Sequence, residues 1–425
     1  MNNKQVTAII IGAGNRGNAY AAYAAEFPDK LKIVGVAEPR DFHRTKMSEN
    51  FGIPTENIYK SWETIVARDK FADIAIIATP DAIHVDPAIA VANKGYNILM
   101  EKPLAPTWNE CKKIETAVKK SKALFCVCHV LRYTSYTRKL KEILNSGIIG
   151  NIVSIQHLKP VGYWHQAHTF VRGNSRNTSE SSFMLLQKSC HDIDWLNYVV
   201  GATCQEISSF GNLMYFKKEN KPDNAGMRCV NCSIEQQCPY SAVKIYVRGM
   251  AARKDNPNFD WPVSAITSDY TVEGVMEALR TGPYGRCVYE CDNDVVDHQV
   301  VNMLFENAVT VSFTMTAFTE ADSDRKTRIF GTKGQLEGNG QKILHYDFLT
   351  EKVTEHITGI SDGSIKTGHG GGDFGIMRDF VDAVATNDGS KIISGLKDTM
   401  ESHQMVFAAE EARLKHTVVK LKSNI

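Results

Sequence analysis

Short apolar runs recur along the first third of this 425-residue chain, and stretches with helical spacing lie between them. The runs cover residues 6–11, 33–37, 74–78, 97–100 and 124–130. Continuous rather than alternating hydrophobicity is typical of strands that helices bury on both faces. Strands that alternate with helices in this way predict an α/β fold with a doubly wound parallel sheet, whose ligands bind at the carboxyl ends of the strands.

A glycine-rich turn follows the first apolar run and opens a helical stretch. It reads Gly12-Ala13-Gly14-Asn15-Arg16-Gly17, and Glu38 stands 21 residues later, at the end of the second run. Glycines at this spacing let the backbone approach a pyrophosphate, the helix N-terminus stabilises the phosphate charge, and the acid binds ribose hydroxyls. A plain glycine turn near an unrelated acid is the alternative. The flanking strand and helix favour a Rossmann dinucleotide-binding domain with these ligands: Gly12, Gly14, Asn15, Arg16, Gly17 and Glu38.

Glu38 also bears on the choice of cofactor. A carboxylate accepts hydrogen bonds from a free 2′-hydroxyl and repels a 2′-phosphate, so the sequence favours NAD over NADP. Arg40 keeps NADP open, because a guanidinium can hold that phosphate. We therefore expect NAD and include Arg40 among the residues of its site.

Polar residues follow the third and fourth apolar runs, where each predicted strand ends. Thr79-Pro80 and then His84 come after one run, and Glu101-Lys102-Pro103 comes after the other. Proline prevents simple continuation of a strand and holds the preceding residue extended. Because ligands of such a sheet bind at this edge, we add Thr79, Pro80, His84, Glu101 and Lys102 to the predicted cofactor site.

Together these motifs resemble the glucose-fructose oxidoreductase, inositol dehydrogenase and MocA superfamily (Gfo/Idh/MocA). The Glu-Lys-Pro element is the most specific short signature of that family. The resemblance continues past the first domain in residues 146–150, 189–194, 304–308 and 329–334. It implies a two-domain enzyme that moves a hydride between a ring carbon of a sugar, sugar derivative or polyol and a bound nicotinamide.

The resemblance also implies two catalytic residues, Lys102 and His191, which match the family's reactive lysine and the histidine that opens a helix in the second domain. The chemistry asks for such groups independently. A base must take the hydroxyl proton as hydride leaves, and a nearby cation stabilises the developing alkoxide. Histidine titrates near neutrality and suits the base, while a buried lysine could fill either role. The alternatives are a solvated loop lysine and a histidine that is bonded only to backbone.

Gln187 departs from the family pattern. Many dehydrogenases of the family carry an aspartate four residues before the catalytic histidine, and a neutral amide cannot stabilise an imidazolium as a carboxylate does. Lys188 stands next to Gln187. The proton relay is therefore expected to differ from that of inositol dehydrogenase.

Candidate substrate ligands lie in residues 161–172, at residues 187–188 and in the glycine-rich stretch 368–373. Residues 161–172 combine aromatic side chains, which bind the apolar faces of sugar rings, with Arg and His, which bind hydroxyls or an acidic group. The alternative is an ordinary structured surface loop. The glycine-rich stretch 368–373 ends in Asp373, a predicted helix N-cap. The predicted substrate-binding residues are Tyr163, Trp164, His165, Arg172, Gln187, Lys188 and His369.

A polar segment of about residues 212–293 interrupts the family pattern and carries half of the ten cysteines. Cys229, Cys232 and Cys238 fall within ten residues, and Cys287 or Cys291 supplies a fourth thiol. This spacing favours a structural zinc site, with an iron–sulfur cluster or free packed thiols as alternatives. A metal staple would suit a polar insert that is expected to bury little apolar area.

The remaining chain predicts a second, α+β domain. Strands at 152–158, 300–305, 309–313 and 329–336 form a largely antiparallel open sheet, and helices at 374–384 and 398–414 return to cover both domains. We expect an NAD-binding domain at 1–130 and a substrate and oligomerisation domain at 131–425. The open face of the sheet, which commonly pairs subunits in the family, predicts a homo-oligomer.

Composition narrows the partners and leaves three functions open. Lys and Arg number 49 against 48 Asp and Glu, so the charge balance argues against nucleic acid or an anionic membrane. No apolar run is long enough to span a bilayer, and no secretion signal opens the chain, so we expect a cytoplasmic protein. The leading function is an NAD-dependent oxidoreductase acting on a carbohydrate. The others are an NAD-dependent glycosidase that oxidises, eliminates, hydrates and re-reduces its substrate, and a non-catalytic dinucleotide and sugar sensor.

Overall fold

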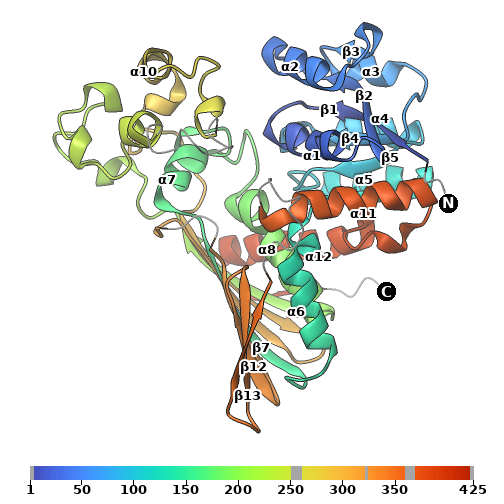
Figure 1. Cartoon of the computed structure of the whole chain (residues 1–425). Coiled ribbons are helices and arrows are strands. Elements are labelled where there is room, and N and C mark those ends of the chain that lie inside the picture. Colours follow the sequence, from blue (N-terminus) through green and yellow to red (C-terminus); the bar gives the residue numbers. More distant parts are fainter. Residues whose placement is uncertain (1–3, 250–260, 321–323, 359–368, 422–425) are drawn as a thin grey trace.

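A computed structural model describes residues 4–249, 261–320, 324–358 and 369–421 (Figure 1). Within these residues, the first third of the chain forms a six-stranded parallel sheet in the order β3-β2-β1-β4-β5-β6. Its strands are β1 (Val6–Ile11), β2 (Leu31–Ala37), β3 (Ile58–Tyr59), β4 (Ile74–Ile77), β5 (Asn97–Met100) and β6 (Phe125–Val127). Its helices are α1 (Asn15–Glu26), α2 (Asp41–Phe51), α3 (Trp62–Ala67), α4 (Val85–Asn93) and α5 (Trp108–Ser121).

Burial on both faces explains the continuous apolar runs. Along β1, Ala8 and Ile10 pack in a core with Tyr20 and Ala21 of α1, which covers one face of the sheet. Ile9 and Ile11 belong to a second core, which contains residues of α4 and α5 on the other face. The predicted doubly wound sheet is confirmed.

The second sheet has nine strands within the described residues, in the order β14-β13-β12-β11-β7-β10-β9-β8-β15. Only the β7–β10 pair among them is parallel, so the predicted largely antiparallel sheet is confirmed. The strands are β7 (Ile152–Pro160), β8 (Cys204–Asn212), β9 (His298–Phe305), β10 (Thr310–Thr316), β11 (Lys326–Gly331), β12 (Gly334–Gly338), β13 (Lys342–Asp347), β14 (Val353–Ile357) and β15 (Val419–Lys420).

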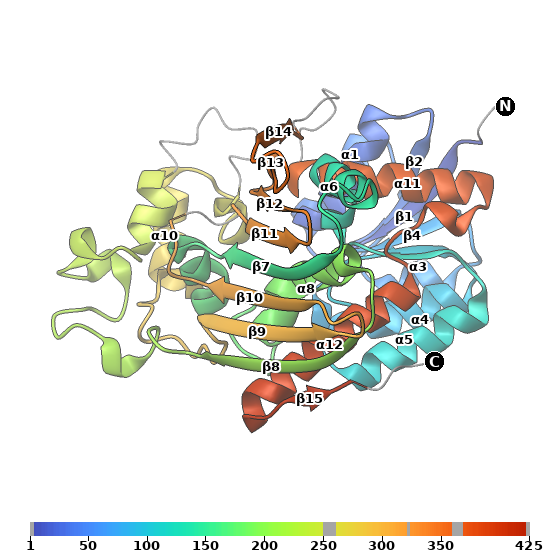
Figure 2. The ribbon, with the colours of Figure 1, turned by 90° about the horizontal axis from the view of Figure 1, so that it is seen from below.

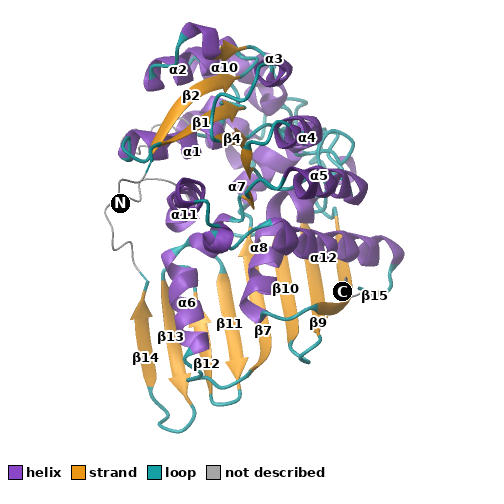
Figure 3. Cartoon of the chain, turned by 90° about the vertical axis from the view of Figure 1, so that its right-hand side faces the viewer, coloured by secondary structure: helices purple, strands orange, loops and turns teal. Residues whose placement is uncertain are grey.

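Within the described residues, helices cover one face of this sheet. Side chains of β7, β9, β10 and β11 share a core with α6 (Ser135–Asn145), α8 (Met184–Val200) and α12 (Leu396–Lys415). Figure 3 shows these three helices on the same side of the nine strands. The opposite face carries alternate residues that are exposed or half-buried, such as Gln156, Asn302 and Ser312.

The C-terminal helices return toward the first sheet. Phe374, Met377 and Phe380 of α11 (Gly372–Thr386) belong to the core under α1 and β1. Figure 2 shows α11 beside α1, while α12 lies between α5 and the large sheet. The site at the carboxyl ends of the first sheet is therefore built from both halves of the chain.

The insert has an apolar core of its own, so the expectation that it buries little apolar area was wrong. Aromatic side chains fill this core, including Phe216, Tyr240 and Tyr246, and α10 (Val272–Thr281) packs on it. In Figure 1 this part lies with α7 (Tyr163–His165) at one end of the large sheet. Among the described residues, no helix is long and apolar enough to cross a membrane.

Candidate active site

The glycine turn between β1 and α1 leaves no room for side chains. Gly12 has φ of +94°, and a Cβ there would lie 2.6 Å from the carbonyl oxygen of Ala78. A Cβ on Gly17 would lie 2.0 Å from the carbonyl oxygen of Gly12. Gly14 stands at the N-cap of α1 and no side chain caps this helix end, so its backbone N–H groups stay available for an anion.

Glu38 is a buried carboxylate at the end of β2, with only 2% of its surface exposed. Its Oε2 accepts a hydrogen bond from the backbone N–H of Ala13 in the glycine turn (2.9 Å), and its Oε1 accepts one from Arg40 Nε (2.7 Å). Burial alone would raise the pKa of Glu38, but the hydrogen bonds from Arg40 and Ala13 lower it. The acid therefore lies beside the glycine turn in its charged form, with Arg40 next to it.

Arg16 joins three of the motifs. Its Nε donates to Glu101 of the Glu-Lys-Pro element (2.5 Å) and its Nη2 to Asp373 (2.7 Å), while Tyr20 hydrogen-bonds both Arg16 and Glu101. Asp373 lies in the first turn of α11, whose N-cap is Gly371, so the predicted capping role for Asp373 was wrong. The carboxylate instead ties α11 to the cofactor turn, a long-range contact that no local sequence pattern signals.

His84 connects the segments that follow β4 and β5. Its Nδ1 lies 2.8 Å from the carbonyl oxygen of Pro103, and its Nε2 lies 2.9 Å from that of Thr79. Only 1% of His84 is exposed. The structure thus brings the Thr79-Pro80 turn and the Glu-Lys-Pro element together through this histidine, whose contacts are with protein carbonyls.

Lys102 reaches the first turns of α8. Its ammonium donates to the carbonyl oxygen of Gln187 (2.5 Å), which lies one helical turn before His191. His191 lies on the same helix and is 6% exposed. Lys102 thus contacts the helix that carries His191, although 89 positions separate the two residues in the sequence.

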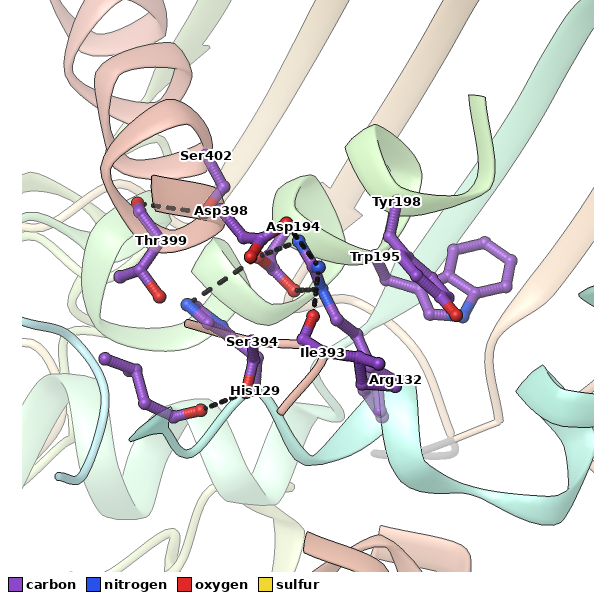
Figure 4. A network of polar contacts seen from close by, with 12 residues as sticks. His129, Arg132, Asp194, Trp195, Tyr198, Ile393, Ser394, Asp398, Thr399 and Ser402 are labelled. Carbon is purple, nitrogen blue, oxygen red and sulfur yellow. Dashed lines mark hydrogen bonds and ion pairs between the residues drawn. The ribbon is translucent and has the colours of Figure 1, made fainter. Parts of the chain in front are cut away.

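A buried polar network joins Arg132 to Asp194 of α8, the helix that also carries His191 (Figure 4). Arg132 and Asp194 form two hydrogen bonds, of 2.7 and 2.8 Å, and each side chain is 1% exposed. His129 Nε2 lies 3.7 Å from Asp194, and its ring packs edge-on to those of His191 and His403. Burial lowers the pKa of His403 to about 3 and that of His129 well below its usual value, so both are neutral. Of these residues, only His191 was predicted from the sequence.

The predicted substrate segment is helical rather than a loop. Residues 163–165 form α7, and residues 166–172 form a π-helical turn. His165 stacks on Trp164, and its Nε2 lies 3.4 Å from Nζ of Lys188 on α8. Tyr163 contacts Lys244 of the insert through its ring. These aromatic side chains are thereby tied to the helix that carries His191 and Gln187.

Two predicted substrate residues, Arg172 and His369, lie outside α7 and α8. Arg172 is 1% exposed and points into the insert, where it donates to the carbonyl oxygens of Arg286 and Tyr240. His369 opens the short turn His369–Gly371 directly before α11. The structure therefore does not bring Arg172 to Lys102 and His191.

Among the described residues, the cysteines of the insert form no disulfide. Among the described residues, no group of three or more His, Cys, Asp or Glu side chains is arranged to hold a metal ion. The structure thus gives no support for the single zinc ion that the spacing predicts. Cys229 and Cys287 are buried in the core of the insert, and Cys238 and Cys291 pack against it.

Comparison with known proteins agrees with this architecture. Residues 6–129 match the family model described as "Oxidoreductase family, NAD-binding Rossmann fold", and residues 141–421 match that of the "C-terminal alpha/beta domain" of the same oxidoreductase family. The scyllo-inositol 2-dehydrogenase (NAD(+)) of Bacillus subtilis is 26% identical over 66% of this chain and 69% of its own. The 2,7-anhydro-N-acetylneuraminate hydratase of Mediterraneibacter gnavus is 24% identical over 54% of this chain and 58% of its own.

A solved levoglucosan dehydrogenase, in complex with NADH and levoglucosan, shares the fold. Its TM-score is 0.73, at 19% identity, and the match covers 99% of this chain and all of the other. At this identity the likeness concerns the arrangement of the chain alone.

Proposed function

Because this chain belongs to the Gfo/Idh/MocA oxidoreductase family, we propose that it moves a hydride between a ring carbon of a sugar, sugar derivative or polyol and the nicotinamide of NAD. The observation that supports this proposal is the hydrogen bond from Lys102, at the carboxyl edge of the first sheet, to the Gln187 carbonyl of α8, the helix that carries His191. Ligands of such sheets bind at this edge.

The residues at the glycine turn fit a dinucleotide. The absence of a Cβ at Gly12 and Gly17 and the uncapped N-terminus of α1 suit a pyrophosphate. The ionised Glu38 suits a ribose with a free 2′-hydroxyl. NAD, when bound, supplies a nicotinamide carbon that accepts or returns a hydride. Arg40, which pairs with Glu38, is the residue that would have to turn toward a 2′-phosphate if NADP were bound.

Lys102 and His191 have separate roles at the substrate hydroxyl. The ammonium of Lys102 is fixed on the Gln187 carbonyl, so it can stabilise the oxygen that develops negative charge as its proton leaves. His191 takes that proton as the base. A positioned base contributes about 10²- to 10⁴-fold to the rate. Behind it, the neutral rings of His129 and His403 and the Arg132–Asp194 pair hold α8 in place.

A redox-neutral reaction is the second candidate. The matched relative from Mediterraneibacter gnavus is named as a hydratase. Oxidation of a ring carbon acidifies its neighbour, so a substituent can leave, water can add, and the hydride can return. Gln187, in place of the aspartate of many dehydrogenases, supports a proton path that differs from theirs.

One experiment separates these reactions. The purified chain is incubated with NAD and a panel of sugars, anhydrosugars, cyclitols and aryl glycosides, while NADH absorbance and products are followed. Net NADH supports the dehydrogenase, and product without net NADH supports the redox-neutral reaction. Saturable sugar binding with neither signal would contradict both and favour a sensor.

Variants at the site make the test specific. Lys102→Met and His191→Asn should each lower turnover by about 10²-fold or more while NAD binding is retained. Lys60→Met and His416→Asn, at exposed positions of the same residue types, are the matched controls and should keep full turnover. Full turnover in both site variants would refute the assignment.

We also infer that the open face of the nine-stranded sheet pairs with a second copy of the chain. Phe210 of β8 is 61% exposed on this face, opposite Val300 of β9. Phe210→Asp should shift the protein toward smaller species in sizing chromatography with light scattering. A monomeric wild-type protein would contradict the inference.

A further inference from the structure

A buried carboxylate joins the first sheet to the segment that leads into α8. Asp81 opens the short 3-10 turn that comes after β4. Ser181 Oγ lies 3.1 Å from both oxygens of this carboxylate, and Ser182 Oγ donates a further hydrogen bond to Oδ2. The serines stand 100 and 101 positions after Asp81 in the sequence, so this is a contact between the two domains.

The serine hydroxyls stabilise the carboxylate in place of water. Asp81 is 7% exposed, and the serines are 8% and 2% exposed. A third donor is the backbone N–H of Ala82 (3.1 Å). Removing a carboxylate from water is costly unless hydrogen bonds replace its hydration. Because hydrogen bonds to a charged acceptor are stronger than those between neutral groups, the buried charge holds both serines firmly.

The two serines come directly before α8, the helix that carries His191. The N-cap of α8 is Phe183, which makes no side-chain capping bond, and the first turn of α8 contains no acidic residue. Negative charge near a helix N-terminus is favourable, because it offsets the partial positive charge of the free N–H groups. The Asp81 carboxylate, which is hydrogen-bonded to the residue before Phe183, supplies this charge from the other domain.

The turn that leads into Asp81 contacts the glycine turn of the cofactor site. A Cβ on Gly12 would lie 2.9 Å from the backbone nitrogen of Thr79, so the two turns are close together. Oγ1 of Thr79 is buried, and in the described part of the chain it has no hydrogen-bond partner. An unsatisfied buried hydroxyl costs free energy. A dinucleotide bound at the glycine turn would remove that cost by hydrogen-bonding to Thr79.

Lys102, after β5, holds the same helix at a second point. Its ammonium donates to the carbonyl oxygen of Gln187 near the start of α8. His84 lies within hydrogen-bond distance of one carbonyl oxygen after β4 and one after β5, so these two segments are fixed to each other. Since the proposed function assigns Lys102 to the substrate hydroxyl, Asp81 is the contact whose removal tests positioning alone.

We propose that Asp81 is a positioning residue, which fixes the start of α8 to the cofactor turn so that bound NAD and His191 are held in one arrangement. The inference rests on the proposed function, because it concerns how NAD and the base for the substrate hydroxyl come together. Hydride transfer depends steeply on geometry, and a displacement of about 1 Å can cost about 10²-fold in rate. The order that NAD imposes on the Thr79 turn passes through Asp81 to the first turns of α8.

Hydrogen exchange of the full chain, measured by mass spectrometry with and without saturating NAD, tests the proposal without a sugar. In the wild type, NAD should slow exchange in peptides that cover residues 183–191. In Asp81→Ala this protection should be lost, although NAD affinity measured by calorimetry stays within about threefold of the wild type. Asp86→Ala, at an exposed position on α4, is the matched control and should keep the protection.

Two results would overturn the inference. One is NAD protection of α8 that persists in Asp81→Ala, including a uniform rise in exchange that leaves the effect of NAD intact, because this marks a purely structural role. The other is a wild type that binds NAD without any protection of α8. Calorimetry on the same samples tests the proposed function separately, since a wild type that fails to bind NAD contradicts that function and this inference with it.

A second variant approaches the contact from the other side. The double variant Ser181→Ala, Ser182→Ala removes the hydroxyls and should reproduce the loss of protection, also where Asp81→Ala fails to fold. With a sugar that the protein converts, both variants should lower kcat by about tenfold or more while the KM for NAD changes by less than about threefold. Asp81→Asn, which keeps an acceptor oxygen, should recover part of kcat. Wild-type kcat in Asp81→Ala and in the double serine variant would contradict the assignment.

Discussion

Replacing Asp194 by asparagine tests how α8, the helix that carries His191, is held in place. The substitution keeps the size of the side chain but removes its charge, and it leaves the buried Arg132 guanidinium with the half-exposed Asp398, at 3.3 Å, as its remaining counter-ion. Two hydrogen bonds of 2.7 and 2.8 Å join the pair, and each side chain is 1% exposed. Breaking a buried pair by removing one partner costs about 3–5 kcal/mol, so we expect the free energy of unfolding to fall by this amount.

The assay is equilibrium urea unfolding followed by tryptophan fluorescence, to which the adjacent, buried Trp195 contributes. Glu355→Gln is the matched control, because Glu355 pairs with Lys342 at 3.1 Å while the side chains are 45% and 47% exposed. Such a surface pair is worth below about 1 kcal/mol. Asp194→Asn with an effect as small as that of Glu355→Gln would refute the reasoning.

Three further predictions concern the cofactor and acid stability. Gly17→Ala places a Cβ 2.0 Å from the carbonyl oxygen of Gly12, so NAD affinity measured by calorimetry should fall by about tenfold or more. Gly249→Ala, where the atom nearest to the new Cβ is 3.5 Å away, should leave NAD affinity unchanged. Equal NAD affinities of Gly17→Ala and Gly249→Ala would contradict the role of the glycine turn. Glu38→Ser removes the carboxylate that repels a 2′-phosphate, so the ratio of NADP to NAD affinity should rise about tenfold or more; an unchanged ratio would exclude that role. Burial lowers the pKa of His403 to about 3. As pH falls from about 6.5 towards 3, this imidazole is protonated in the unfolded chain but not in the folded one, so the free energy of unfolding decreases. His403→Gln should reduce the decrease in the free energy of unfolding by about 1.4 kcal/mol per pH unit, measured by urea unfolding at a series of acid pH values. The same dependence on pH in the variant and the wild type would contradict this prediction.

The sequence predicted the elements whose signal is local. Continuous apolar runs matched β1 and β5 to the residue, and the glycine turn, Glu38 and the Glu-Lys-Pro element all lie at the strand ends where they were expected. The last run of the first sheet was predicted too long. After Val127 the chain leaves the sheet, and Val130 is buried in a 3-10 turn, which keeps the residue apolar without making it part of a strand.

Long-range polar contacts could not be predicted in this way. Arg132 and Asp194 are 62 positions apart, and Arg16 and Asp373 are 357 apart, so neither pair leaves a periodic trace in the sequence. Arg172 was predicted to bind substrate because it lies among aromatic residues. The turn of the π-helix directs its side chain into the insert instead.

The most direct test of the central claim is the fate of the ring hydrogen. Sugars from the panel that carry deuterium at their ring carbons are mixed with the enzyme and NAD, the reaction is quenched within one turnover, and the NADH is analysed by mass spectrometry. Hydride transfer predicts deuterium on the nicotinamide ring, whether the overall reaction is oxidative or redox-neutral, and its loss in Lys102→Met. Unlabelled nicotinamide with every sugar that the protein converts would contradict the account.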